Sequence, residues 1–312
     1  MRILLIKTSS LGDVVHNLPV VTDLRTRFPA ADIDWVVEEA FADIPRLHPG
    51  VGQVIPVAVR RWRRSLLSPQ TWREIGSLRK RLGAARYDIA IDTQGLLKSA
   101  LITRMAPTRR CGYAADSARE PLASRFYDAR FEVAKTLHAV ERNRRLAAFA
   151  GGYVSNGAPD YGITVPSAPT PGPTAVLLTA TSRDDKLWPE DRWIALGCEF
   201  QARGLYCLLP AGNSLERERA ERIASRIPQA NLLPPSGLGE LAGHLSAARI
   251  VVGVDTGLVH LAAALGRPTL ALFAASDPAL TGVLARTPAF NLGSRGQPPS
   301  VAEVLAAAAP LL

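Results

Sequence analysis

The chain has 312 residues, of which 47% are hydrophobic and 21% are charged. Such a chain can bury one large core or two medium ones, so it is not disordered, and two domains are the default expectation. The 37 Lys and Arg residues outnumber the 28 Asp and Glu residues, which gives a net charge of +9. This excess favours an anionic partner: nucleic acid, a phosphorylated ligand or an acidic membrane face.

Cysteine usage and hydropathy indicate a protein of the reducing cytosol. Cys111, Cys198 and Cys207 are far apart and form no C-x-x-C pair, so neither a disulfide framework nor a zinc site is expected. The apolar run at residues 1–6 stops at Lys7 and is too short for a signal-peptide core. No later stretch approaches a membrane span, so we expect any membrane contact to be peripheral.

Short aliphatic runs alternate with longer amphipathic stretches in the first half of the chain. This rhythm is typical of β-α-β units with a parallel sheet. We expect strands over residues 3–6, 33–37 and 87–91, and helices around residues 14–28, 70–85 and 95–106. Pro and Gly crowd residues 155–173, which therefore read as a linker, and we place the domain boundary near residue 165.

The same rhythm restarts after the linker. We expect strands over residues 175–178, 205–209, 250–254 and 269–273, and helices near 190–203, near 214–226 and from about 257. The fold class is therefore α/β, with two doubly wound halves. Ligands of open α/β sheets bind at the carboxyl ends of the strands, so we expect function in the strand-end loops and in a crevice that the halves share.

The loop after the first strand reads Lys7-Thr8-Ser9-Ser10-Leu11-Gly12-Asp13. We expect Gly12 to let the backbone turn tightly and Asp13 to lie at the start of the next helix. Two roles for Asp13 stay open, and they are compatible. It caps the helix, or it is a general base that takes a proton from an acceptor hydroxyl.

The second half contains a matching strand, turn and helix start, with the sequence Asp255-Thr256-Gly257-Leu258-Val259-His260 in the turn. Free N–H groups and the helix dipole predict a diphosphate cradle here, with Thr256 and His260 as added donors. Structural capping by Asp255 and Thr256 is the alternative. Lys186, in the loop after the first strand of this half, is a candidate phosphate ligand, and a solvated loop charge is its alternative.

The densest cationic cluster is Arg60-Arg61-Trp62-Arg63-Arg64, and five more cations follow before residue 87 with only Glu74 opposing them. Arginine forks suit carboxylates and phosphates. Trp62 and Trp72 make nucleic acid conceivable through stacking, but no binding module accompanies them. An anionic lipid headgroup fits at least as well.

No metal site is expected. Asp32 and Asp34 have the D-x-D spacing of metal-dependent sugar transferases, but they open a strand, and we expect them at the surface. The histidines His16, His48, His138 and His244 have no ligand-like spacing among them.

Together these stretches resemble the ADP-heptose lipopolysaccharide heptosyltransferases, and within that family the branch that adds the first heptose. The resemblance covers nearly the whole chain. The matching stretches are residues 7–16, 35–39, 60–63, 118–124, 183–186 and 254–260.

The resemblance implies a GT-B fold, in which two Rossmann-like domains face a central cleft. Residues 1–164 would bind the acceptor and residues 165–312 the donor, with the last helix free to pack back on the first domain. The implied reaction is inverting, metal-independent transfer of L-glycero-D-manno-heptose from ADP-heptose to the inner Kdo of Kdo2-lipid A. The implied location is the cytoplasmic face of the inner membrane, with peripheral contact to anionic lipid and no nucleic-acid partner.

The resemblance also implies roles for individual residues. Asp13 would be the base, and Lys186 with the 255–260 turn would stabilise the departing diphosphate. The donor set is Thr181, Ser182, Lys186, Glu218, Asp255, Thr256, Gly257 and His260. The acceptor set is Ser10, Gly12, Arg60, Arg61, Arg63, Arg64 and Arg119. Ser182 and Ser236 depart from the threonine and methionine expected there. The alternatives are the second heptosyltransferase or another transferase of the family, a non-catalytic anion-binding protein and a nucleic-acid-binding module.

Overall fold

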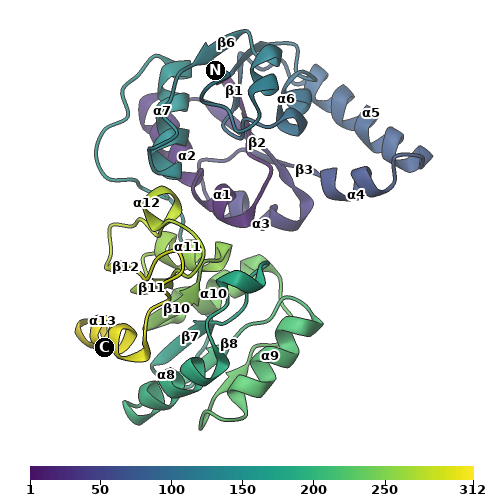
Figure 1. Ribbon diagram of the computed structural model, residues 1–312. Helices are drawn as coiled ribbons and strands as arrows, with labels where there is room; N and C mark the ends of the chain where they lie inside the picture. Colours follow the sequence, from purple (N-terminus) through teal and green to yellow (C-terminus); the bar gives the residue numbers. More distant parts are fainter. The chain divides into compact units, whose positions relative to one another are not determined.

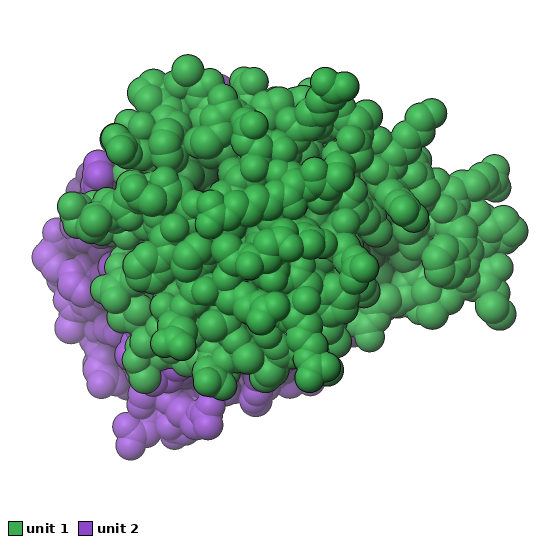
Figure 2. Space-filling model, turned by 90° about the horizontal axis from the view of Figure 1, so that it is seen from above, with its two compact units in different colours: residues 1–162 green, residues 163–312 purple.

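The computed structural model describes all 312 residues, which form two compact units, Met1–Gly162 and Ile163–Leu312 (Figures 1 and 2). No helix or strand occurs between Gly151 and Thr174, so the division falls inside the stretch where the sequence predicts a linker. None of the helices combines the length and the hydropathy that a bilayer crossing requires.

Unit 1 is built on a six-stranded parallel sheet with helices on both faces (Figure 1). Its strands are β1 (Arg2–Ile6), β2 (Asp32–Glu38), β3 (Gln53–Val57), β4 (Ile89–Asp92), β5 (Arg109–Tyr113) and β6 (Ala129–Phe131). The spatial order is β3-β2-β1-β4-β5-β6. This is the doubly wound Rossmann order, whose direction reverses between β1 and β4.

The helices of unit 1 are α1 (Leu11–Val15), α2 (Leu18–Arg27), α3 (Asp43–Arg46), α4 (Val59–Arg64), α5 (Pro69–Ala84), α6 (Leu97–Thr103) and α7 (Ala139–Gly151), with short 3₁₀ turns η1 (Glu39–Phe41) and η2 (Pro121–Phe126). The helices cover both faces of the sheet, so the central strands are continuous apolar sequences. All four residues from Ile3 to Ile6 are completely buried.

Unit 2 repeats the architecture. Its strands are β7 (Thr174–Leu178), β8 (Tyr206–Leu209), β9 (Asn231–Leu232), β10 (Ile250–Val254), β11 (Thr269–Leu272) and β12 (Ala289–Leu292). The order β12-β11-β10-β7-β8-β9 is the same Rossmann order counted within the unit, and its direction reverses between β7 and β10. The expectation of two doubly wound parallel sheets is confirmed.

The helices of unit 2 are α8 (Glu190–Ala202), α9 (Ser214–Ala224), α10 (Leu238–Ala247), α11 (Gly257–Ala264), α12 (Pro278–Thr281) and α13 (Val301–Ala308), with 3₁₀ turns η3 (Asp184–Lys186) and η4 (Ala309–Leu311). The last helix, α13, belongs to the core of its own unit. Its Val304 and Ala308 are fully buried in the cluster that contains Trp188 and Trp193.

Three local expectations are wrong. The helix expected over 14–28 is two helices, because Pro19 cannot donate a backbone hydrogen bond and sits in the first turn of a new helix. Gly12 lies inside α1 and has no positive φ, so it makes no special turn. Asp34 is 2% exposed rather than at the surface. Tyr87 and Arg2 donate hydrogen bonds to its carboxylate at 2.7 and 3.2 Å, and the sheet is covered on both faces at that strand.

Candidate functional site

Each unit gathers polar side chains in the loops after the two strands that flank its reversal point. In unit 1 these loops follow β1 and β4, and in unit 2 they follow β7 and β10. Parallel strands end at one edge of a sheet, so loops that are far apart in sequence meet there. Each unit therefore has one candidate site at its carboxyl edge.

In unit 1 the site is organised around Asp13, at the third position of α1. Ser10, not Asp13, is the N-cap residue, and the Ser10 amide and hydroxyl both donate to Asp13 Oδ2, at 2.9 and 3.2 Å. This is the reach-back contact of a capping box. Arg119, from the loop after β5, donates two further hydrogen bonds to the carboxylate, at 2.9 and 3.3 Å. The family resemblance implies both residues as site residues but not their pairing.

Nearby positive charge keeps Asp13 ionised. Burial alone would raise the pKa of Asp13, but the charges of Lys7 and Arg119 outweigh it and hold that pKa below its usual value. Lys7 is 4% exposed and donates to Thr93 O at 2.8 Å and to Asn143 Oδ1 at 3.2 Å. Burial lowers the pKa of Lys7 to about 8. Asp13 can therefore accept hydrogen bonds, and in the end a proton, from an incoming hydroxyl.

The arginines of α4 divide into two kinds. Arg61 forms ion pairs with Glu39 and Glu74, at 3.2 and 3.0 Å. The guanidinium of Arg60 lies 5.1 Å from the centre of the Phe41 ring. Arg63 and Arg64 are exposed, and neither is in an ion pair within 4.0 Å. They are free to meet an anionic ligand.

Two residues that sequence reasoning missed help to build this site. Gln94 follows β4, and its Oε1 accepts from the amides of Thr8 and Ser9 at 2.9 and 3.1 Å, which fixes the loop before Asp13. Lys98, at the start of α6, donates to Ser9 Oγ at 2.6 Å. Burial and then the charges of nearby arginines, including Arg60, lower the pKa of Lys98. Both residues follow β4, a strand at the reversal point, and this position could have indicated that they belong to the site.

In unit 2 the site is organised around Asp255, directly after β10. Lys186 Nζ donates to Asp255 Oδ2 at 2.6 Å, and Ser276 Oγ donates to the same oxygen at 2.5 Å. His260 Nε2 lies 3.8 Å from Oδ1, and Thr181 Oγ1 donates to the Asp255 carbonyl at 3.0 Å. Burial would raise the pKa of Asp255, but the contacts with His260, Lys186 and Ser276 hold it well below the usual value.

The capping alternative is wrong for this turn. Thr256 is the N-cap residue of α11 but makes no side-chain cap, and the carboxylate of Asp255 binds Lys186 and Ser276 instead. Unsatisfied amides at Gly257 and the next residue, together with the helix dipole, form an anion-binding end. Lys186 has three N–H donors, of which Asp255 takes one, so the others can reach a phosphate.

Ser276 is a further residue that sequence reasoning missed, although it lies shortly after a strand end. The structure does not connect two predicted donor residues to the Asp255 cluster. Ser182 and Glu218 are both exposed, and neither makes a hydrogen bond with it.

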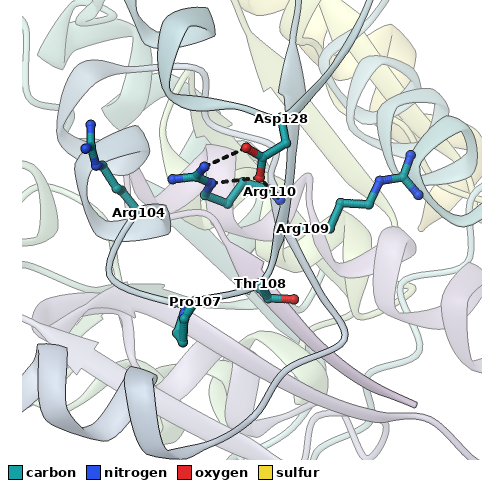
Figure 3. Close-up of a pocket in the computed structure, with 7 residues that line it drawn as sticks. Arg104, Pro107, Thr108, Arg109, Arg110 and Asp128 are labelled. Carbon is teal, nitrogen blue, oxygen red and sulfur yellow. Dashed lines mark hydrogen bonds and ion pairs between the residues drawn. The ribbon is translucent and has the colours of Figure 1, made fainter.

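A separate cavity of about 540 Å³ lies at the opposite edge of the unit 1 sheet, where β5 begins (Figure 3). Arg110 and Asp128, two of the residues that line it, form a two-fold hydrogen-bonded pair, at 2.8 and 2.5 Å. Because it opens at the starts of the strands, it is not part of the Asp13 site. No group of three or more His, Cys, Asp or Glu side chains is placed to hold a metal ion.

Comparisons with known proteins match the chain along most of its length. The model of glycosyltransferase family 9 (heptosyltransferase) matches residues 75–304. Lipopolysaccharide heptosyltransferase 1 of Pseudomonas aeruginosa is 47% identical, over 94% of this chain and 84% of that protein. The structure of E. coli heptosyltransferase WaaC with ADP is 40% identical, has a TM-score of 0.93 and covers 100% of both chains. WaaC with ADP-2-deoxy-2-fluoro heptose has a TM-score of 0.87 at 41% identity, over 97% of this chain and 96% of that one.

The ion pair at the unit 1 site gives a testable titration. Replacing Arg119 with Met removes one of the two cations that stabilise the charged form of Asp13, so the pKa of Asp13 rises. Carboxyl ¹³C NMR of the folded protein, with Asp13→Asn to assign the signal, measures this. Arg125→Met, an exposed arginine of η2, is the matched control and leaves the titration where it is. An unchanged Asp13 titration in Arg119→Met would show that the pair does not set the ionisation.

Proposed function

Because the chain belongs to glycosyltransferase family 9, the heptosyltransferases, we propose that it transfers the first heptose from ADP-heptose to the inner Kdo of Kdo2-lipid A. It is a glycosyltransferase of the two-domain GT-B type that acts in lipopolysaccharide synthesis. Family membership favours a glycosyltransferase over the non-catalytic binding protein and the nucleic-acid-binding module. The observation that carries the proposal is the full-length match to WaaC, whose structures hold ADP and an ADP-heptose analogue.

Unit 1 supplies the acceptor side of the proposed reaction. The inner-core acceptor carries carboxylates and phosphates, and Arg63, Arg64 and Arg119 are guanidinium groups that suit both. When a Kdo carboxylate draws Arg119 away, Asp13 loses one of the charges that depress its pKa. Its pKa then rises toward the range in which a carboxylate is an effective base. Acceptor binding itself would thus prepare Asp13 to take the hydroxyl proton.

Unit 2 supplies the donor side. The diphosphate of ADP-heptose would lie at the start of α11, against its free amides and the ammonium of Lys186. We propose an inverting displacement: the acceptor oxygen bonds to the anomeric carbon as the bond to the diphosphate breaks, and the hydroxyl proton passes to Asp13. The charge that develops on ADP is stabilised by Lys186 and the turn, so the reaction needs no metal.

The proposed acceptor is a membrane lipid. We therefore propose that the enzyme works as a peripheral protein on the cytoplasmic face of the inner membrane.

The experiment that tests this function compares acceptors. The purified enzyme is given ADP-heptose with Kdo2-lipid A, or with the same lipid already carrying one heptose, and ADP release is measured together with the mass of the product. We expect turnover on the first acceptor and little on the second. The reverse preference would assign the chain to the second heptosyltransferase, and the absence of heptose in the product would refute the proposal.

The donor site gives a second prediction. Lys186→Met removes the cation beside the leaving diphosphate, so kcat falls by about 10²–10³-fold, the usual effect of losing one donor to developing charge. Arg183→Met is a control on the same loop, because Arg183 pairs with its neighbour Asp185. Turnover of the wild-type enzyme persists in EDTA. A Lys186→Met enzyme with wild-type kcat, or a wild-type enzyme that EDTA inactivates, would contradict this account of the leaving group.

A further inference from the structure

Helices α4 and α5 carry almost all of the chain's positive excess. Residues 59–86 contain nine Lys and Arg residues and one Glu, a net charge of +8, whereas the whole chain has +9. Only Arg61 of these cations is in an ion pair with a carboxylate. The segment projects from the body of unit 1 in Figure 1, and in Figure 2 it extends from the green unit.

The turn between the two helices presents apolar side chains to solvent. Leu67 is 99% exposed, Leu66 is 55% exposed, and Trp72 in the first turn of α5 is 60% exposed. The turn is ordered: Trp72 Nε1 donates to Leu66 O at 2.8 Å, and Thr71 Oγ1 donates to Ser65 O at 2.9 Å. These hydrogen bonds hold the leucines outward, where water solvates them poorly.

The exposed face of α5 continues the same surface with positive charge. Trp72, Gly76 and Arg79 recur at helical spacing along it, with Lys80 beside them, and all four are exposed. A different face of the helix carries its buried residues, Thr71, Leu78 and Leu82. An apolar tip with an indole, next to a row of cations, is the pattern of a segment that lies in a membrane interface.

We propose that residues 59–86 form a membrane-docking surface, in which Leu66, Leu67 and Trp72 enter the headgroup region of a bilayer and the cations of α5 bind anionic lipid phosphates. Charge favours an anionic membrane over a second copy of the chain, because two copies of this segment would each carry +8 and repel one another. Nucleic acid would satisfy the cations but leave the leucine tip exposed. The proposal rests on the proposed function, in which the acceptor is a membrane lipid. The contacts between this surface and a bilayer, however, can form without any acceptor.

Flotation with vesicles tests the surface without any sugar acceptor. The wild-type protein floats with vesicles of phosphatidylethanolamine and phosphatidylglycerol, and much less with phosphatidylcholine alone. The variant Leu66→Ser/Leu67→Ser lowers the partition coefficient by about tenfold or more, since two exposed leucines no longer bury their side chains. Arg79→Gln/Lys80→Gln lowers it by roughly tenfold, and wild-type binding weakens with salt. Leu215→Ser, which removes a 75% exposed leucine from α9, is the matched control and floats like the wild type.

Tryptophan fluorescence gives a second readout, which would not change on vesicle binding if Trp72 had only a structural role. Trp72 is exposed, whereas the other four tryptophans are at most 8% exposed. Brominated lipids therefore quench the wild-type fluorescence on vesicle binding, and Trp72→Phe loses that quenching.

The proposal is overturned if the wild-type protein stays unbound, if Leu66→Ser/Leu67→Ser floats like the wild type, or if quenching does not depend on Trp72. A dimer without vesicles that the leucine variant dissociates would also overturn it and assign the surface to a second copy. Turnover on a deacylated, water-soluble acceptor is unchanged in the leucine variant. If the wild-type enzyme shows no turnover on this soluble acceptor but still binds vesicles, the proposed function is refuted and the docking surface is not.

Discussion

A carboxylate in the segment that follows a central strand, kept ionised by a cation from a distant loop, is the interaction on which each unit's site depends. Asp13 pairs with Arg119 in unit 1, and Asp255 pairs with Lys186 in unit 2. Burial would otherwise favour the neutral acid at both positions, because an unpaired charge is costly away from water. The pairs are possible because each sheet has the same strand order, which brings the loops after β1, β4 and β5, or β7, β10 and β11, to one edge.

The surroundings of the two carboxylates differ in a way that suits different work. Asp13 lies among cations, with Lys7 buried nearby. An anionic acceptor that binds Arg119 would therefore weaken the ion pair between Arg119 and the Asp13 carboxylate. Asp255 is set among hydroxyls, His260 and the free amides of a helix start. In our account Asp255 is a positioning residue that aims Lys186 at the diphosphate, whereas Asp13 touches the reacting hydroxyl.

The sequence predicted the strands on both sides of each reversal point and the loops that bear the sites, because buried parallel strands are unbroken apolar runs followed by small and polar residues. It missed the internal strand β5, whose residues Arg109 and Arg110 interrupt the apolar pattern. Edge strands were missed for physical reasons. β3 contains Pro56, which only an edge strand tolerates, and β9 has two residues. The partners of the carboxylates could not be predicted either. Arg119 is 106 residues from Asp13, and only the folded sheet brings them together. The family resemblance named both residues, but the ion pair came from the structure.

The central claim is that Asp13 takes the proton of the acceptor hydroxyl, and single-turnover kinetics of Asp13→Asn test it most directly. Asn can still accept the hydrogen bonds from Ser10, so α1 keeps its cap, but it cannot accept a proton. The account predicts that the rate of heptose transfer falls by about 10²–10⁴-fold while ADP-heptose and the acceptor still bind. Transfer at close to the wild-type rate would contradict it.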